Sequence, residues 1–327
     1  MPRRTDDHPD RTDPNRSGRA RAARRRGQAE RDDPPVELDA VSLTHPRKIL
    51  WPDAGFTKLD LAEYYRTIAP YLVPLMRDRP LTLRPYPRGI AAPGYYLQDA
   101  PKARPKWVPT WKDVATSVGR TVEHIVGGDE RTLLWLAQYN AIEVHTWLSR
   151  IDRPDAPDFA VVDLDPSEAT PFEHVKQAAR LFKEQFDRAG VQGFPKVTGS
   201  SGIHVFVPLE RGPAFDVVRA SLHALCRRIE ARAPDLVTTD PVIADRGDRV
   251  FLDYAQNSRG RTTVAPYSVR PKPGAPVAAP IRWEELDDPS LRPNRWSIRD
   301  MPARLEAVGD LVGPMLRCRQ RLPDAWT

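Results

Sequence analysis

The chain has 327 residues, of which 40% are hydrophobic, so it can form a substantial core in one large or two ordinary domains. It contains no run of about 18 apolar residues and no apolar stretch behind its N-terminal arginines, which excludes a membrane span and a secretory signal. The net charge of +6 does not describe the whole chain: residues 1–31 contain ten arginines and five acidic residues, so the other 296 residues are nearly balanced and a uniformly basic body is excluded.

Residues 1–34 contain almost no large apolar side chain, so we expect a disordered, arginine-rich tail. Its run RARAARRR could bind DNA phosphates without sequence specificity. A solvated tail without a dedicated ligand would have the same composition, and both interpretations remain open.

Four helices are predicted after the tail. The first starts at Thr57, which has capping-box spacing to Asp60, and it is expected to stop at Pro70. The second is apolar on most faces and should be buried, whereas the third and fourth are amphipathic, and Gly190 ends the third. These three helices are predicted over residues 132–150, 172–190 and 214–233.

Three short runs have the composition of strands: FAVVDLD (159–165), IHVFVPL (203–209) and RVFLDY (249–254). Strands and helices are interspersed, but they do not alternate strictly as in a doubly wound sheet. No internal repeat is visible. The sequence therefore predicts an α/β fold.

Two aspartates, Asp163 and Asp165, end the first of these strands, and Pro166 follows them. Side chains two residues apart on a strand share a face, with their Cα atoms roughly 6–7 Å apart. Two carboxylates in this arrangement repel each other unless a cation lies between them. The pair therefore suggests a metal site, although a strand-to-loop turn in which one aspartate caps the next helix is an equal alternative.

A Gly/Ser loop, TGSS, leads into the second strand. Glycines allow backbone N–H groups to approach a phosphate closely, and Ser200 adds a hydroxyl donor. His204 follows within the strand, on the face opposite Ile203 and Val205. Taken alone, the loop is weak support for a phosphate site, and a lone strand histidine is more often a core residue than a ligand.

The third strand again ends near an aspartate, Asp253, and the polar residues QNSRGR (256–261), which include Arg261, follow it, with Arg270 further on. Three aspartates on strands, a Gly/Ser loop and several arginines are the groups that metal-assisted phosphoryl transfer requires. Carboxylate oxygens favour Mg²⁺ or Mn²⁺ over zinc.

In this order and spacing, the three stretches resemble the polymerase domain of bacterial DNA ligase D, a member of the archaeo-eukaryotic primase superfamily. The resemblance covers roughly residues 36–310. It extends to the motifs LTHPRKILWPDAGFTKLDLAEYY, IEVHTWL, DLDP, GSSGIHV, DYAQNSRGRTTVAPYSVR and APIRWEELDD. It implies a primase-polymerase fold, with an RRM-like catalytic sheet of antiparallel or mixed strands and a smaller packed α/β subdomain before it.

The resemblance also implies roles for individual residues. Asp163, Asp165 and Asp253 match the catalytic carboxylates that hold two Mn²⁺ or Mg²⁺ ions. The positions around the incoming nucleotide match Ser200, His204, His145 at the end of the predicted buried helix, Arg246, Gln256 with its neighbour Asn257, and Arg270. The DNA-binding positions match Lys48 and Lys58 at a 5′-phosphate, Tyr95 and Tyr96 in place of paired phenylalanines that stack on template bases, and His45.

The two lysines have independent support, because the chain has only nine lysines beside 41 arginines and two of them lie close together here. Solvated surface lysines are the alternative.

This sequence also departs from the family pattern. Ser201 stands where family members commonly have Lys or Arg, YYLQDAP lacks a basic residue often found there, and His45 replaces a polar amide. The change at Ser201 has two possible consequences. Either the site is short of one phosphate-binding charge, which is the consequence we expect, or a nearby basic side chain replaces it, with Lys196 the nearest along the chain.

The implied activity is template-dependent addition of nucleotides to a DNA 3′ end, for gap filling in non-homologous end joining, with a family preference for ribonucleotides and Mn²⁺. A primer-independent primase and a non-catalytic DNA end-binding module are the alternatives. The expected partners are gapped or broken DNA with a 5′-phosphate, NTP or dNTP, bacterial Ku and a separate ligase.

The chain contains no ligase or nuclease motif, so the resemblance suggests a free-standing polymerase, with a domain at 35–312 and a C-terminal extension at 313–327. Its two cysteines, Cys226 and Cys318, are far apart and suit a reducing cytoplasm, where we expect the protein to associate with the nucleoid.

Overall fold

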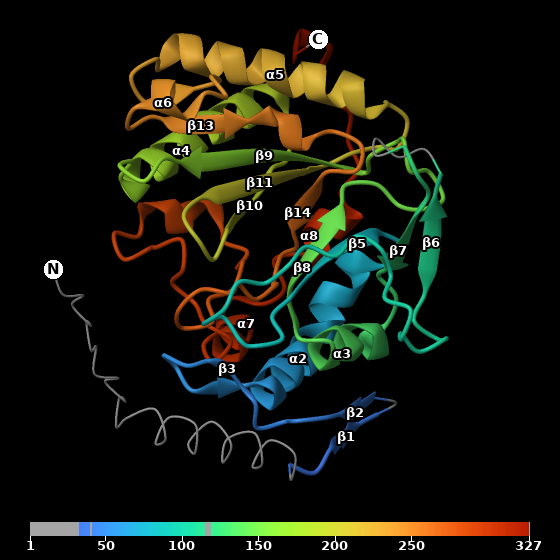
Figure 1. Cartoon of the computed structure of the whole chain (residues 1–327). Helices are drawn as coiled ribbons and strands as arrows, with labels where there is room; N and C mark the ends of the chain where they lie inside the picture. Colours follow the sequence, from blue (N-terminus) through green and yellow to red (C-terminus); the bar gives the residue numbers. More distant parts are fainter. Residues whose placement is uncertain (1–32, 40, 115–118, 327) are drawn as a thin grey trace, which may run out of the picture.

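The computed structural model describes residues 33–39, 41–114 and 119–326. Nearly all of the expected arginine-rich tail therefore lies outside the described residues. Two five-stranded sheets form the framework of the described chain, one in the upper half of Figure 1 and the other below it.

The upper sheet carries the three predicted strands and has the strand order β10-β11-β9-β13-β12. Its neighbours are antiparallel except for the parallel pair β12 and β13. The strands are β9 (Phe159–Pro166), β10 (Phe194–Val197), β11 (Ile203–Pro208), β12 (Val237–Thr238) and β13 (Val250–Asp253). This confirms the three predicted strands and the mixed sheet.

Helices α4 (Phe172–Ala189) and α5 (Phe215–Arg232) accompany this sheet, as predicted, and Gly190 ends α4 in the left-handed conformation with φ 67°. A Cβ on Gly193 would lie 2.7 Å from the ring of Phe186 in α4 and 2.9 Å from the side chain of Val205 in β11. The helix α4 therefore covers the face of the sheet that carries Val205. Because side chains alternate along a strand, His204 projects from the opposite face.

The second sheet has the order β14-β8-β5-β7-β6 and is antiparallel throughout. Its strands are β5 (Pro80–Pro85), β6 (Thr110–Asp113), β7 (Val122–Val126), β8 (Ala141–Trp147) and β14 (Thr262–Val264), and helices α2 (Lys58–Met76) and α3 (Glu130–Gln138) pack with it. Because β14 follows Asp253 in sequence, this subdomain does not simply precede the catalytic sheet. It also has as many strands as that sheet.

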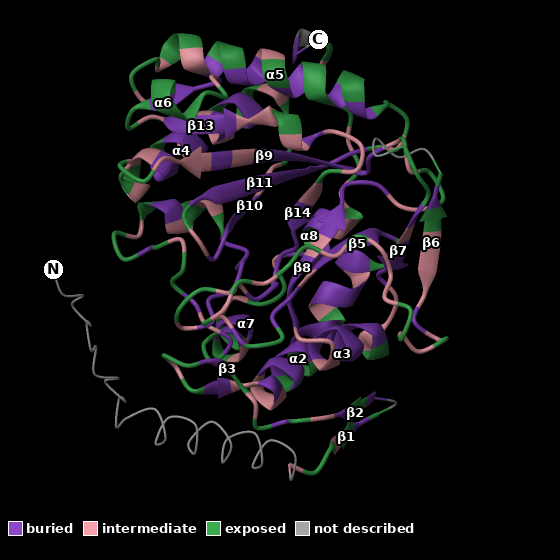
Figure 2. Cartoon of the chain, in the orientation of Figure 1, coloured by how far each residue is buried: buried purple, intermediate pink, exposed green. Residues whose placement is uncertain are grey.

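Short elements complete the described chain. They are β1 (Val36–Leu38), β2 (Val41–Leu43), β3 (Ile49–Trp51), β4 (Phe56–Thr57), α6 (Ile243–Arg246), η1 (Tyr254–Gln256), η2 (Trp283–Asp287), α7 (Met301–Val308), α8 (Gly313–Arg317) and η3 (Asp324–Trp326). The expected C-terminal extension packs onto the body, since the buried ring of Trp326 lies 5.9 Å from that of Phe186. Figure 2 shows β11 and β13 as largely buried, the edge strand β6 as mostly intermediate or exposed, and much of the outer side of α5 as exposed.

Two helix predictions were wrong. The run 132–150 is not one helix: α3 ends at Gln138, the chain turns through Asn140 with φ 58°, and β8 follows. Apolar and polar residues alternate over 142–145 of β8, and pairing with β5 and β14 on both sides determines the conformation of this strand. His145 therefore lies on a strand and not at the end of a buried helix.

The first helix does not stop at Pro70. It begins at the predicted capping box, in which Thr57 accepts from the Asp60 N–H, but it continues through Pro70 and Pro74 to Met76. The last turn buries Leu72, Val73, Leu75 and Met76. Burial of this apolar surface outweighs the backbone hydrogen bonds that the two prolines cannot donate.

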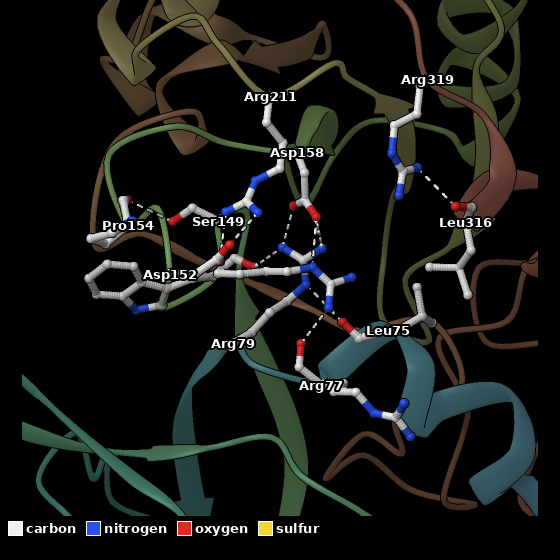
Figure 3. A network of polar contacts seen from close by, with 12 residues as sticks. Leu75, Arg77, Arg79, Ser149, Asp152, Pro154, Asp158, Arg211, Leu316 and Arg319 are labelled. Atoms are coloured by element: carbon white, nitrogen blue, oxygen red, sulfur yellow. Dashed lines mark hydrogen bonds and ion pairs between the residues drawn. The ribbon is translucent and has the colours of Figure 1, made fainter.

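A buried ion cluster joins the end of α2 to the start of β9, where the two sheets meet (Figure 3). The side chain of Arg79 is 1% exposed and forms an ion pair with Asp158, with its Nη1 2.6 Å from a carboxylate oxygen. It also donates to the carbonyl groups of Leu75 and Trp147. Arg150 donates to the same carboxylate at 2.9 Å, so Asp158 ties the end of β8 and the loop after it to Arg79, which is 79 positions away in the chain.

No helix in these described segments is both long and apolar enough to cross a lipid bilayer.

Candidate active site

The three predicted aspartates lie on one face of the catalytic sheet. Asp163 and Asp165 are two residues apart on β9, and β13 pairs with β9 so that Asp253 is directly opposite Asp163. Directly paired residues on neighbouring strands place their Cβ atoms about 4.5–5.5 Å apart on the same face. The register of β13 therefore brings together carboxylates that are 90 positions apart in the chain.

Mutual repulsion and burial perturb this group. Burial, with the charges of Asp163 and Asp253, raises the pKa of Asp165 to about 6, against a smaller opposing effect of Arg246. Burial and the charge of Asp163 also raise the pKa of Asp253. For Asp163, burial alone would raise the pKa, but the charge and hydrogen bond of His204 outweigh burial and lower it.

Each carboxylate faces a different partner. Asp163 is 3.3 Å from Nε2 of His204, Asp165 is 3.7 Å from Nη1 of Arg246, and Asp253 accepts from the N–H of Ala255 at 2.9 Å. In this conformation, no three acidic, histidine or cysteine side chains of the described residues converge closely enough to hold a metal ion.

The donor set nevertheless fits Mg²⁺ or Mn²⁺. Carboxylate oxygens are the preferred ligands of these ions, and burial together with the charge of Asp163 raises the pKa values of Asp165 and Asp253, an effect that a cation bound between the aspartates would oppose.

The Gly/Ser loop connects β10 to β11 beside these carboxylates. The Thr198 hydroxyl accepts from the N–H groups of Ser200 and Gly202 and fixes the turn. A Cβ at Gly202 would lie 2.3 Å from the Leu164 carbonyl oxygen, so only glycine fits against β9 here. Ser201 is exposed at the tip of the loop.

Arg246 comes from the short helix α6 and is 9% exposed. It stacks on Phe251, with its guanidinium carbon 3.7 Å from the ring centroid, and it donates to the carbonyl groups of Asp240 and Pro241. These contacts hold the guanidinium beside Asp165. The structure therefore brings Arg246 to the aspartates, as the sequence suggested.

Arg270 connects the loop to the second sheet. It donates to the Thr198 carbonyl at 2.9 Å and to Oε1 of Glu143 at 2.7 Å. Glu143 is 1% exposed and also faces His145, whose Nε2 is 3.7 Å from the same oxygen, and Arg84 at 3.4 Å. Although burial acts to raise it, the pKa of Glu143 is lowered to about 2 by His145, Arg270 and Arg84.

The two polar residues after Asp253 differ in their surroundings. Gln256 donates to the Asp253 carboxylate at 3.1 Å and lies at the site. Asn257 is fully buried, accepts from the Val161 N–H at 2.8 Å and donates to the carbonyl groups of Val161 and Tyr254. Asn257 thus ties the η1 turn to β9 and does not face a nucleotide.

The expected 5′-phosphate residues lie around β3 and the start of α2, at the lower end of the molecule in Figure 1 and apart from β9. Lys58 is 2% exposed and donates to the Thr44 carbonyl at 2.9 Å and to Oε1 of Gln138 at 2.8 Å. Lys48 donates to the Pro87 carbonyl. Neither lysine forms an ion pair with any described residue, and burial, with a smaller effect of Lys48, lowers the pKa of Lys58 to about 8.

The aromatic pair is exposed, as stacking on bases requires. Tyr95 is 45% exposed and Tyr96 is 67% exposed, and the guanidinium of Arg84 lies 5.0 Å from the Tyr96 ring centroid. His45 is also exposed and adopts φ 53° in the turn before Lys48.

Sequence reasoning missed the central position of Glu143 and the strand neighbours of Lys196. Glu143 and His145 alternate with Ile142 and Val144, which is a strand pattern, but the prediction of a helix over this run concealed it. Lys196 is paired in register with His204, and this follows only from the pairing of β10 with β11.

Comparison with known proteins agrees with this geometry. Residues 57–312 match the family model described as LigD, primase-polymerase domain. The chain is 32% identical over 279 residues to the multifunctional non-homologous end joining protein LigD of Mycolicibacterium smegmatis, covering 85% of this chain and 36% of that protein. It is 33% identical over 279 residues to the protein of the same name from Pseudomonas aeruginosa, covering 83% and 32%, so it spans about a third of these relatives.

A solved structure is similar over almost its whole length. The polymerase domain from Mycobacterium tuberculosis ligase D, in complex with DNA, superposes with a TM-score of 0.80 at 31% identity, covering 84% of this chain and 98% of that one. The matching family model, the relatives and the shared fold lead to one conclusion: this chain belongs to the LigD primase-polymerase domain family.

Proposed function

We propose that this chain is a template-dependent nucleotidyltransferase that adds nucleotides to DNA 3′ ends and fills gaps during non-homologous end joining. The observation that carries this proposal is the pairing of β9 with β13, which gathers Asp163, Asp165 and Asp253 beside the Gly/Ser loop. The names of the relatives and the DNA complex of the similar structure support the choice of repair and of a DNA substrate.

The proposed cofactor is a pair of Mn²⁺ or Mg²⁺ ions held by the three aspartates. When bound, such ions neutralise the triphosphate and favour ionisation of the attacking 3′-hydroxyl. His204 holds one oxygen of Asp163 by its 3.3 Å contact, and Gln256 similarly restrains Asp253. These contacts orient the carboxylates.

The nucleotide would lie between the two sheets. The Gly/Ser loop offers backbone N–H groups and the hydroxyl of Ser200 to the phosphates, with Arg246 and Arg270 as cationic neighbours. His145 is suited to contact the sugar, because its Nε2 makes no hydrogen bond and the nearby Glu143 carboxylate, at 3.7 Å, is already engaged by Arg270.

DNA would be held away from the chemistry. Exposed Tyr95 and Tyr96 are suited to stack on template bases, and Lys48 and Lys58 are suited to bind a 5′-phosphate across the gap. Bacterial Ku and a separate ligase are the partners that end joining would require, and the proposed location is the cytoplasm.

A gapped duplex with a labelled primer and a 5′-phosphate, supplied with Mn²⁺ and single NTPs or dNTPs, tests this function. We expect extension only by the nucleotide complementary to the template. Products formed equally well without a primer would instead identify a primase. Tight DNA binding without extension under every condition would identify a non-catalytic end-binding module.

The proposed 5′-phosphate site makes a separate prediction. Lys58 has no counter-ion among the described residues, and its two hydrogen bonds leave one of its three N–H groups for a phosphate. Wild type should bind a recessed 5′-phosphorylated end more tightly than a 5′-hydroxyl end. Lys58→Ala should remove most of this difference and leave binding to the hydroxyl end unchanged in fluorescence-anisotropy titrations.

The same preference should depend on pH. With the pKa of Lys58 lowered to about 8, its charge is present below that pH and is lost as the pH rises through it. The phosphate itself gains its second charge near pH 6, at about the second pKa of a phosphate monoester. The preference should therefore be greatest near pH 7 and decline above pH 8. Exposed Lys102→Ala is the control, and an equal loss on both ends in Lys58→Ala would reduce Lys58 to a general backbone contact.

A further inference from the structure

Four ionisable side chains form a continuous row across the catalytic sheet. In register, Lys196 of β10 pairs with His204 of β11, His204 pairs with Asp163 of β9, and Asp163 pairs with Asp253 of β13. Directly paired residues share a face, so all four project from the face opposite the one that α4 covers. Strands are about 4.8 Å apart, which places Lys196 roughly 10 Å from the Asp163 backbone, on the side of the Gly/Ser loop.

The amino group of Lys196 lacks a partner. The residue is 1% exposed, and its Nζ makes no hydrogen bond or ion pair with any residue that the structure describes. Burial, together with the charge of Arg270, lowers the pKa of Lys196 well below that of a free lysine, against the opposing charge of Asp163. A buried ammonium group costs several kcal/mol unless an anion accompanies it, so the charged form of Lys196 requires an anionic partner.

Other orphaned polar atoms face the same region. Nδ1 of His204 and Nε2 of His145 are also buried without a hydrogen-bond partner. Both residues project from strands that carry the proposed nucleotide site. The buried amine of Lys196 and these two imidazole nitrogens are therefore available to a polar ligand that enters the site.

The loop that begins after Lys196 lacks a cation of its own. Ser201 at its tip is neutral and exposed, whereas Lys196 opens the same hairpin five residues earlier. Of the two possibilities that the sequence left open for Ser201, the orphaned amine favours replacement by Lys196 over a site deficient in charge.

We propose that Lys196 is a phosphate ligand of this site and that its ammonium group binds the outer phosphates of the incoming nucleotide from the β10 side of the loop. This inference rests on the proposed function, since it assigns one end of the triphosphate to Lys196. Its side chain has four rotatable bonds and no hydrogen bond to break, so it can extend toward a phosphate when the nucleotide enters. The three N–H groups of the ammonium then gain acceptors.

The test replaces Lys196 with methionine, which has a similar length and no charge. Nucleotide affinity, measured by equilibrium binding of a non-hydrolysable NTP analogue, should fall about five- to a hundredfold, as expected for a lost charge-assisted contact. The KM for NTP should rise by a similar factor with little change in kcat. Inorganic tripolyphosphate should lose affinity in parallel, whereas a nucleoside without phosphates should not.

The stability of the Lys196→Met variant shows whether Lys196 binds a ligand or supports the fold. Because Nζ has no partner to lose, Lys196→Met should leave the urea midpoint unchanged or raise it. Lys176 is the matched control: it is 4% exposed, pairs with Glu173 at 2.8 Å and donates to the Asp288 carbonyl. Lys176→Met should lower stability and leave nucleotide affinity unchanged.

The substitution Ser201→Lys gives the complementary experiment, in which a charge is added to the loop instead of removed from β10. In wild type, the added charge should leave the KM for NTP flat or raise it, because Lys196 already fills the position. In the Lys196→Met background, the same substitution should restore affinity. Unchanged analogue affinity in Lys196→Met, or a five- to hundredfold fall in KM for Ser201→Lys alone, would overturn the proposal. If wild type binds NTP through Lys196 but never extends a primer, the polymerase function fails and the ligand assignment stands.

Discussion

Replacing Asp163, Asp165 or Asp253 with asparagine is expected to reduce primer extension by at least about 10³-fold, because metal-ion charge stabilisation contributes several kcal/mol to such reactions. Asparagine keeps the shape of each side chain but removes the anionic oxygen that a divalent cation requires. Single-turnover extension of the gapped duplex measures the effect. Binding of the same DNA should be unchanged, because the lysines and tyrosines proposed to hold DNA lie elsewhere.

Stability distinguishes this loss from misfolding. The pKa of Asp165 is raised to about 6, so in the metal-free protein its ionisation above that pH opposes folding. Asp165→Asn should therefore be at least as stable as wild type at pH 8, with the advantage disappearing below about pH 4. Asp248→Asn, at an exposed aspartate in the turn before β13, is the control and should keep full activity. Appreciable extension by an Asp163→Asn/Asp165→Asn double variant would refute the assignment of these carboxylates.

Asp158→Ala is expected to destabilise the protein by about 3–5 kcal/mol, because it leaves the 1% exposed guanidinium of Arg79 buried without its counter-ion. Urea unfolding followed by circular dichroism measures this change. The control is Asp152→Ala: Asp152 pairs with Arg211 at 2.7 Å, but its side chain is 60% exposed, so its loss should cost less than about 1 kcal/mol.

The ion pair of Asp158 and Arg79 also predicts that a second substitution restores stability and that the free energy of unfolding depends on pH. Adding Arg79→Met to Asp158→Ala should recover part of the lost stability, because it removes the uncompensated charge. Burial acts to raise the pKa of Asp158, but Arg79 and Arg150 outweigh it and lower this pKa. The contribution of Asp158 is thus present above about pH 4 and is lost as the pH falls through its lowered pKa. Equal effects of Asp158→Ala and Asp152→Ala would show that burial of the pair has no energetic consequence.

The sequence predicted best those elements whose signals are local. The capping box of Thr57 and Asp60, the amphipathic faces of α4 and α5, and the left-handed Gly190 each depend on residues within one or two helical turns. The family resemblance added the order of the motifs and the identity of the three carboxylates.

Failures occurred where tertiary packing overrides local preference. Pro70 does not end α2, because the following turn buries apolar side chains that the core requires. The run after Gln138 becomes a strand because β5 and β14 pair with it on both edges. Neither partner is adjacent in sequence, so a pattern within one window could not reveal the pairing.

The site itself follows from strand register. Spacing along the chain placed Asp163 beside Asp165, but only the pairing of β9 with β13 places Asp253 opposite them. The pairing of β10 with β11 and of β11 with β9 assembles the row that includes Lys196. On β8 of the second sheet, Glu143 contacts both His145 and Arg270. A lone lysine or glutamate within an apolar strand gives no signal of such neighbours.

The central claim, that Asp163, Asp165 and Asp253 together hold the catalytic metal ions, is tested most directly by crystallography with Mn²⁺. Crystals of the chain with gapped DNA, a non-hydrolysable NTP and Mn²⁺ should show anomalous peaks on the shared face of β9 and β13. Each peak should lie about 2.0–2.3 Å from an aspartate oxygen, within the range expected for a divalent cation with oxygen ligands. Nucleotide bound in the site with no anomalous peak within ligand distance of any of the three aspartates would contradict the claim.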